Sequence, residues 1–309
     1  MPVSFRGPET SDFASSIVTG ASGFVGSALV PMLDRPVALS LGSPDWRARM
    51  AATDFAGAVV YHLAARVHDA GSGGEAAYME DNHDKTLELA RSAAAAGARG
   101  FVFLSTAKVN GEETREAGFT AHDVPRPEDA YARSKWAAER SLAALASRSG
   151  LPVAIVRPPL VFGPGAKANL HALLRICDSA LPLPFASIRN RRSFIDASDL
   201  GRLLRAAVHR EPGVTRTYMA AHPQPFSTPE LARGIRAALG RPARLIPFPP
   251  AALEALAALA GRRSAASRLT RSLEVDARET EAALGWAAGT SLERSIATMV
   301  AAYRGVGPA

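Results

Sequence analysis

Hydrophobic residues along the chain alternate between short unbroken runs and stretches with helical spacing. The first run ends in Ile17 and Val18, and residues 19–23 are too small and too rich in glycine to continue a strand. From Phe24 to Met32 the apolar residues recur at helical spacing. This stretch therefore predicts a strand, a glycine turn and a helix.

The same alternation of apolar runs and helical spacing continues along the chain. Strands are predicted at residues 37–41, 58–65, 101–104 and 214–221, and helices at residues 78–97 and from Tyr131 onward. Strands that alternate with helices of this length form a parallel sheet, and ligands bind at the carboxyl ends of its strands. The pattern predicts an α/β protein with a parallel sheet.

Three glycines in the first turn each stand where a side chain would interfere. Gly20 permits the tight turn, Gly23 lets a pyrophosphate approach the backbone, and Gly26 lets helix and strand pack closely. Free N–H groups at the start of the helix would face the anion. The spacing is G-x-x-G-x-x-G, yet its place between a strand and a helix favours a dinucleotide site over a purely structural turn.

The end of the second predicted strand bears on the choice of cofactor. Residues 40–42 offer no carboxylate for the ribose hydroxyls, and Arg47 and Arg49 follow closely. The two arginines favour NADP slightly over NAD, although they could equally form a solvated helix face. Asp45 and Trp46 are the candidates to meet the adenine, and the short segment between residues 42 and 55 predicts an abbreviated adenine end.

Acid–base chemistry is expected near Thr106, which ends a predicted strand, and on the helix that begins at Tyr131. Tyr131 and Lys135 are four residues apart and so share one helix face. A neighbouring ammonium would lower the pKa of the phenol and make it a usable acid or base. His62 is expected to be a packed, hydrogen-bonded strand residue, because neither a carboxylate nor a nucleophile neighbours it in sequence.

Composition indicates a globular protein with 47% hydrophobic residues and a single cysteine, Cys177, expected to be a buried helix residue in a reducing compartment. The net charge of +7 comes mostly from scattered arginines without interleaved aromatics, which argues against a nucleic-acid partner. No spacing typical of a metal site occurs. Residues 1–16 lack the apolar core of a signal peptide, and residues 249–260 are too short to span a membrane, so no membrane insertion is expected.

These pieces, taken together, resemble an extended short-chain dehydrogenase/reductase of the nucleotide-sugar epimerase/dehydratase family. The matching motifs keep the family's order and cover most of the chain. They are TGASGFVG at 19–26, HLAA at 62–65, STAKVNG at 105–111, YARSK at 131–135, RPPLVFGPG at 157–165, RRSFIDASDL at 191–200 and LGW at 284–286.

The resemblance implies a Rossmann-type NAD(P)-binding domain with a doubly wound parallel sheet, at residues 14–165 and 195–222. It also implies a smaller C-terminal α/β substrate lobe, at residues 166–194 and 223–305. Tyr131 would exchange a proton with the sugar, Lys135 would hold the nicotinamide ribose, and Thr106 would bind the reacting oxygen. On the substrate side Asn169 would meet the nucleotide, and Arg192 would neutralise the diphosphate with Lys167 as a further candidate. The residues expected at the cofactor are Gly20, Ser22, Gly23, Phe24, Val25, Gly26, Asp45, Trp46, Leu63, Ala64, Ala65, Asn82, Tyr131, Lys135 and Pro158.

The departures from the family pattern narrow the expected reaction. Dehydratases of the family follow the active-site threonine with an acidic pair, whereas this chain has Ala107 and Lys108, which argues against dehydration. The glycine of the family's N-V-x-G-T is replaced by Lys85. The run at residues 156–170 and the RNRRSF motif resemble a subgroup that reduces UDP-4-keto-6-deoxy-N-acetylhexosamines for surface polysaccharide.

The sequence therefore favours 4-keto reduction of a UDP-sugar by a cytoplasmic enzyme, with UDP-hexose 4-epimerisation as the alternative, since both reactions use the same residues. Two other classes of function were weighed: a non-catalytic NAD(P)-binding regulator and a basic nucleic-acid binder. The intact Thr106, Tyr131 and Lys135 argue against the regulator. A homodimer through the helices near residues 80–97 and 128–149 is expected from the resemblance alone.

Overall fold

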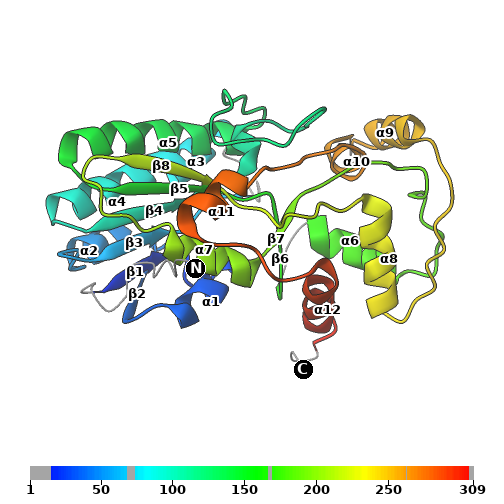
Figure 1. Ribbon diagram of the computed structural model, residues 1–309, viewed down its shortest axis with the longest axis horizontal. Coiled ribbons are helices and arrows are strands. Elements are labelled where there is room, and N and C mark those ends of the chain that lie inside the picture. The colour runs from blue at the N-terminus through cyan, green and yellow to red at the C-terminus, as the bar shows by residue number, and fades with distance from the viewer. Residues whose placement is uncertain (1–14, 68–73, 166–168, 262, 306–309) are drawn as a thin grey trace, which may run out of the picture.

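The computed structural model describes residues 15–67, 74–165, 169–261 and 263–305, and Figure 1 shows their arrangement. Its central feature is a parallel sheet of six strands in the order β2-β1-β3-β4-β5-β8. These strands are β1 (Ser16–Thr19), β2 (Pro36–Leu39), β3 (Val59–His62), β4 (Gly100–Leu104), β5 (Val153–Arg157) and β8 (Thr215–Met219). The chain thus has the α/β fold with a doubly wound parallel sheet that the sequence predicts.

The register of the sheet brings the ends of its first strands together. Ile17 on β1 lies beside Val37 on β2 and Val60 on β3. Strand order reverses between β1 and β3, and ligands of open α/β sheets bind at such a switch point, outside the carboxyl ends of the strands. The glycine turn follows β1 directly, so it lies at this point.

Strand β2 is the edge of the sheet, whereas the common six-strand dinucleotide-binding order places another strand beyond it. Between β2 and β3 the chain forms only one short helix, α2 (Trp46–Ala51). The abbreviated segment that the sequence predicts at residues 42–55 is therefore confirmed.

Helices cover both faces of the sheet (Figure 1). The residues of α2, α4 (Lys85–Ala95) and α5 (Ala130–Ser149) pack on one face around Phe101, Phe103 and Leu142. Helices α1 (Phe24–Leu29) and α7 (Ala197–Ala206) pack on the other face.

The predicted helix at residues 78–97 is interrupted. It consists of α3 (Gly74–Met79), a π-helical turn (Glu80–Asp84) and α4. The turn contains Asn82, whose buried side chain forms hydrogen bonds with Arg66 and Ser134. A π-helical turn inside an α-helix often marks a functional site.

A second group of elements lies beside the sheet, in the right-hand part of Figure 1. Its core includes Phe162, Phe194 and Phe226, whose rings lie 5.2–5.8 Å apart. The elements are β6 (Leu160–Phe162), β7 (Phe194–Asp196), α6 (Asn169–Asp178), α8 (Thr228–Ala238), α9 (Pro250–Leu259), α10 (Arg263–Thr270) and α12 (Leu292–Tyr303), with α11 (Arg278–Leu284) beside β8. The bounds of two lobes given above remain a prediction.

Cys177 is buried on α6, as the sequence predicts, and burial raises the pKa of its thiol to about 11. In the described part of the chain, no helix combines the length and the apolar character needed to cross a bilayer.

Candidate active site

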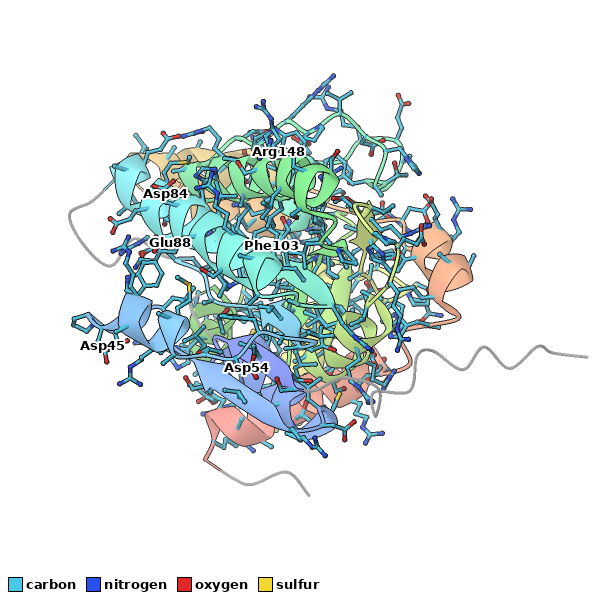
Figure 2. All side chains as sticks on the ribbon, turned by 90° about the vertical axis from the view of Figure 1, so that its left-hand side faces the viewer. Asp45, Asp54, Asp84, Glu88, Phe103 and Arg148 are labelled. Carbon is cyan, nitrogen blue, oxygen red and sulfur yellow. The ribbon has the colours of Figure 1, made fainter. Side chains whose placement is uncertain are left out.

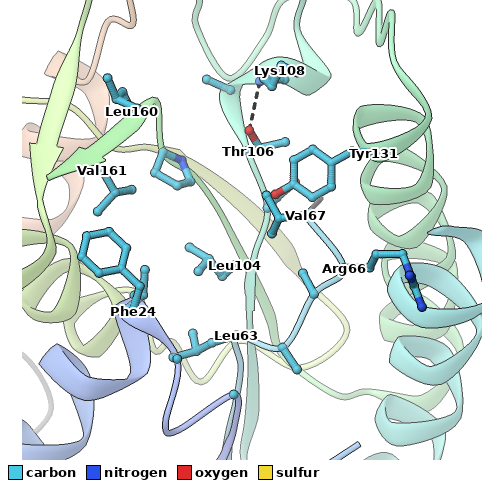
Figure 3. Close-up of a pocket in the computed structure, with 18 of the residues that line it drawn as sticks. Phe24, Leu63, Arg66, Val67, Leu104, Thr106, Lys108, Tyr131, Leu160 and Val161 are labelled. Atoms are coloured by element: carbon cyan, nitrogen blue, oxygen red, sulfur yellow. Dashed lines mark hydrogen bonds between the residues drawn. The ribbon is translucent and has the colours of Figure 1, made fainter. Parts of the chain in front are cut away.

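A cavity of about 930 Å³ opens at the carboxyl ends of β1, β3 and β4 (Figure 3). Most of the residues predicted for the site line this cavity. They are Gly20, Ser22, Gly23, Phe24, Val25, Gly26, Leu63, Ala64, Ala65, Thr106, Tyr131, Pro158 and Arg192. The structure thus brings the glycine turn, the strand-end threonine and the tyrosine to one space.

The glycine turn has the steric demands that its sequence predicts. Gly20 has a φ of +71°, and a Cβ there would lie 2.8 Å from the backbone nitrogen of Ala64. A Cβ on Gly26 would lie 2.2 Å from the carbonyl oxygen of Gly20, which no side chain tolerates. The turn therefore packs closely against the end of β3 and leaves its backbone open toward the cavity.

Thr106 lies just beyond the end of β4 and caps a short 3₁₀ turn. Its hydroxyl accepts a hydrogen bond from the backbone nitrogen of Lys108 at 3.3 Å, the contact drawn in Figure 3. Figure 3 shows Thr106 and Tyr131 beside one another, with Phe24 and Val161 across the cavity. Both hydroxyl groups can therefore reach the same atom of a bound ligand.

Tyr131 is placed by the first turn of α5. Asp129 caps this helix, because its carboxylate accepts a hydrogen bond from the backbone nitrogen of Ala132 at 2.7 Å. The Tyr78 ring meets the Tyr131 ring edge-on, with centroids 6.4 Å apart. The helix cap and the ring contact together fix the direction of the phenol.

The lowered phenol pKa expected from the sequence is wrong. Burial raises the pKa of Tyr131 above its ordinary value and the negative charge of Asp129 adds to the rise, while a hydrogen bond with Thr106 opposes it. The spacing of Tyr131 and Lys135 is as predicted, but the Lys135 ammonium is itself buried and loses part of its charge at neutral pH.

Lys135 lies beneath the cavity, and its side chain is 1% exposed. Its ammonium nitrogen lies 4.1 Å from the centre of the Phe103 ring and, among the described residues, finds no hydrogen-bond acceptor. Burial lowers the pKa of Lys135 to about 7, and the carboxylate of Glu139 opposes that shift. A buried ammonium without an acceptor fits the hydroxyls of a ribose, so the residues present suit a bound dinucleotide.

Behind Lys135 lies a buried polar network that the sequence analysis missed. Arg157 on β5 donates from Nε to Glu139 at 3.0 Å, the Ser105 hydroxyl also bonds to Glu139, and all three residues are buried. Glu139 is four residues beyond Lys135, so the same helical spacing that linked Tyr131 to Lys135 could have identified it. The network ties α5 to β4 and β5 beneath the site.

His62 is a structural residue, as predicted. Its two ring nitrogens lie 2.6 Å from the Thr19 hydroxyl and 2.7 Å from the Thr86 hydroxyl, and it is completely buried. Burial lowers the pKa of His62 to about 3, so the ring is neutral.

Asn82 is not among the residues that line the cavity. Its side chain accepts from the backbone nitrogen of Arg66 at 2.7 Å, and donates to the carbonyl of Arg66 and to the hydroxyl of Ser134. Asn82 therefore holds the segment after β3, which lines the cavity, instead of contacting it directly.

Asp45 and Trp46, the predicted adenine contacts, also lie outside the cavity lining. The Asp45 carboxylate is exposed at the outer edge of the molecule, where it accepts from Arg49 at 2.8 Å (Figure 2). Trp46 is the first residue of α2, and its side chain is buried in the hydrophobic core on one face of the sheet. The structure thus does not bring either side chain to the predicted site.

On the substrate side the cavity is lined by Arg192 and Arg268. Arg192 donates to the carbonyl of Arg271 at 3.1 Å, and burial lowers its pKa to about 10, with Glu112 opposing and Arg268 adding to the shift. Asn169 is the first residue of α6, but the structure does not describe its side chain. Lys167 is not among the described residues.

A charged trio beside Tyr131 also went unpredicted. Lys108 pairs with Glu112 at 2.6 Å and with Asp129, and all three residues line the cavity. In sequence only Lys108 stands out, as the residue that replaces an expected acid. The position of Lys108 between two carboxylates depends on the loop that leads to α5.

The glycine turn, Thr106 and the pair of Tyr131 and Lys135 define the class of short-chain dehydrogenases/reductases. More narrowly, the chain belongs to the NAD dependent epimerase/dehydratase family, whose model matches residues 16–220. It is an enzyme of this family and uses NAD or NADP.

The chain is similar to several known proteins over most of its length. It is 32% identical to a UDP-glucose 4-epimerase from Vibrio cholerae, a match that covers 94% of this chain and 95% of the relative. Two solved structures share its fold. RMD from Pseudomonas aeruginosa, complexed with NADPH, has a TM-score of 0.71 at 21% identity and covers 94% of this chain and 99% of its own. A UDP-N-acetylglucosamine 4-epimerase from Bacillus cereus has a TM-score of 0.72 at 19% identity, covering 92% and 96%.

Proposed function

We propose that the protein catalyses oxidation or reduction at a ring carbon, C4, of a UDP-sugar. The observation that carries this proposal is the convergence of Thr106, Tyr131 and the glycine turn on one cavity. Beneath it lies the Lys135 ammonium, which has no hydrogen-bond acceptor in the part of the chain that the structure describes. A bound NAD(P) supplies the hydride acceptor or donor. The remaining chemistry falls to side chains of this chain.

In this proposal Tyr131 exchanges a proton with the sugar oxygen on the reacting carbon. The Thr106 hydroxyl, already placed by the 3₁₀ turn that it caps, binds the same oxygen and fixes its distance from the phenol. Lys135 holds the ribose hydroxyls, and their oxygens give its ammonium the acceptors that the described residues do not provide.

Arg192 and Arg268 are proposed to neutralise the diphosphate of the substrate. Both line the cavity, and guanidinium groups form short charge-assisted bonds to phosphate oxygens. Asn169 and Lys167, which stand at or just before the start of α6, remain candidates for the nucleotide on the strength of the sequence.

Dehydration is not proposed. Ala107 is buried and carries no acid, and Lys108 is a cation held between Glu112 and Asp129. Dehydratases of the family carry an acidic pair directly after the threonine, and neither Ala107 nor Lys108 has a carboxyl group.

Two net reactions share the proposed site. The motifs at residues 156–170 and 189–194 favour reduction of a UDP-4-keto-6-deoxy-N-acetylhexosamine. The name of the Vibrio cholerae relative favours 4-epimerisation, which is oxidation followed by reduction on the opposite face of the sugar. We place reduction first and epimerisation second.

The two reactions differ in how they use the cofactor. The purified protein is incubated with a UDP-4-keto-6-deoxyhexosamine and NADH or NADPH, and the absorbance of reduced nicotinamide is followed. A reductase consumes reduced cofactor in proportion to product. If the absorbance stays constant while UDP-glucose and UDP-galactose interconvert in a parallel assay, the reductase proposal is overturned in favour of the epimerase. A regulator without activity would bind the cofactor and turn over neither substrate.

The cellular setting is proposed from the same resemblance. We infer a cytoplasmic role in the biosynthesis of surface polysaccharide, and a homodimer through the helices near residues 80–97 and 128–149. Sedimentation of the purified protein tests the dimer, for which a monomer across the micromolar range is the opposing result.

A further inference from the structure

The cavity extends to the end of the edge strand β2, where Leu41 and Gly42 line it. In dinucleotide-binding folds the end of this strand faces the ribose of the adenosine half, and an acid there commonly accepts the 2′-hydroxyl. Residues 40–43 of this chain contain no acid. The groups that face this end of the cavity therefore come from elsewhere in the chain.

One such group is the ammonium of Lys85, at the first residue of α4. Its nitrogen lies 3.4 Å from the carbonyl oxygen of Leu41 and 2.7 Å from the carboxylate of Asp81. Lys85 lines the cavity, and its side chain is only 17% exposed. The ammonium is thus held at the end of β2, inside the cavity, by two contacts that fix its position.

Lys85 shares its carboxylate partner, Asp81, with a second cation. Asp81 accepts from Arg66 at 2.7 Å through its second oxygen, so two cations surround one carboxylate, and all three residues line the cavity. Burial alone would raise the pKa of Asp81, but the hydrogen bonds from Lys85 and Arg66 outweigh it and hold that pKa below its ordinary value. The carboxylate therefore stays ionised and is shared by both cations.

The two arginines that the sequence offered for this role are engaged elsewhere. Arg47 donates to both oxygens of Glu88, at 2.8 and 3.1 Å, and Arg49 donates to Asp45. Neither arginine lines the cavity. Lys85, a departure from the family pattern, lies where the sequence favours one of the two arginines.

We propose that Lys85 binds the 2′-phosphate of the adenosine ribose and makes the site selective for NADP(H) over NAD(H). A phosphate dianion gains a charge-assisted hydrogen bond from the Lys85 ammonium and is attracted by the charges of Lys85 and Arg66, which both line the cavity, whereas a 2′-hydroxyl gains little from either. The inference deepens the proposed function by naming its cofactor, and it rests on that function only in so far as the cavity binds a dinucleotide.

The test is binding of NADPH and NADH to the purified full-length chain, measured by nicotinamide fluorescence without substrate. The wild type is expected to bind NADPH at least tenfold more tightly than NADH, the lower end expected of a bond to a charged group. Lys85→Met is expected to weaken NADPH binding by roughly 10- to 100-fold while it changes NADH binding by less than about threefold. Lys85→Arg keeps the cation and should keep the preference.

Arg47→Met is the matched control. It also removes one cation, but Arg47 pairs with Glu88, and neither residue lines the cavity. It should leave both affinities unchanged. Adenosine 2′,5′-bisphosphate should displace NADPH from the wild type better than adenosine 5′-diphosphate does, and Lys85→Met should remove this difference.

Three results would overturn the inference: equal affinity of the wild type for the two cofactors, tighter binding of NADH, or equal losses of both in Lys85→Met with unchanged far-ultraviolet circular dichroism. Tighter binding of NADH would mean that Asp81 accepts the 2′-hydroxyl. These results leave the proposed function standing, because a dinucleotide still binds. Failure to bind either dinucleotide would instead overturn the proposed function.

Discussion

At the scale of single residues, Lys135 is the most unusual side chain of the site. It is fully buried, lacks a hydrogen-bond acceptor among the described residues, and has a pKa lowered by burial to about 7. Burial of this ammonium without an acceptor lowers the free energy of unfolding, and hydroxyl groups of a ligand would offset that loss.

This burial predicts a dependence of stability on pH. A lysine whose pKa falls on folding binds fewer protons in the folded than in the unfolded state between pH 7 and about 10, so stability rises with pH in this window. The free energy of unfolding of the wild type, relative to Lys135→Met, should increase by roughly 1 to 3 kcal/mol between pH 7 and pH 9. Urea unfolding at the two pH values measures it, and a constant difference between the two proteins would show that the lysine is solvated.

Asp129 predicts a second effect of pH, this time on catalysis. Its negative charge adds to the raised pKa of Tyr131, and its carboxylate caps α5. Asp129→Asn keeps an oxygen for the cap and removes the charge, so the pKa of Tyr131 should fall. The limb of the pH–rate profile that reports Tyr131 should then move to lower pH. A shift to higher pH, or none, would contradict the assigned electrostatic role of Asp129.

Sequence alone located these residues but not their ionisation. The four-residue spacing placed Tyr131 and Lys135 on one helix face, as the structure confirms. The predicted direction of the tyrosine pKa was wrong, because the spacing does not reveal how deeply each group is buried or that Asp129 lies near the phenol.

At the scale of elements, the glycine turn between β1 and α1 was predicted almost completely. Local sequence determines its conformation, because Gly20 needs a positive φ and Gly26 touches the preceding backbone. The π-helical turn at residues 80–84 was not predicted. Its Asn82 accepts a hydrogen bond from the backbone nitrogen of Arg66 and donates one to the hydroxyl of Ser134, and both partners lie in other segments.

The turn yields a prediction about packing. In Gly26→Ala the new methyl would lie 2.2 Å from the Gly20 carbonyl oxygen, so α1 must shift away from β1. The expected loss of stability is about 1 to 3 kcal/mol, together with loss of dinucleotide binding. Denaturant unfolding and cofactor titration measure the two effects.

Gly42→Ala serves as the control for stability, because a Cβ at Gly42 has no atom within 4 Å. It should unfold at nearly the same denaturant concentration as the wild type. If Gly26→Ala were equally harmless, the close packing of helix and strand would not be required.

At the scale of the whole molecule, the site is assembled from segments spread between residues 20 and 273. The sequence predicted the sheet, its parallel strands and the strand ends that carry Gly20 and Thr106, because these follow from local patterns. The meeting of Lys85, Asp81 and Leu41 could not be predicted. It depends on the missing strand beyond β2 and on how the shortened segment packs Trp46 into the core.

The same scale explains why Asp45 and Trp46 were misplaced. Their position in sequence suits a loop that reaches the adenine, but Asp45 directly precedes α2 and Trp46 begins it. The position of Trp46 in the sequence is compatible with a place at the adenine or in the core, and tertiary packing places it in the core.

The central claim is that Tyr131 transfers the proton in a dinucleotide-dependent reaction at a UDP-sugar carbon. The measurement is turnover of UDP-sugar substrate by Tyr131→Phe and wild type side by side, with NAD(P)H affinity determined for both. The account predicts that the variant binds the dinucleotide as the wild type does and turns over about 10²- to 10⁴-fold more slowly. Near-normal turnover by Tyr131→Phe would remove Tyr131 from the mechanism and contradict the account.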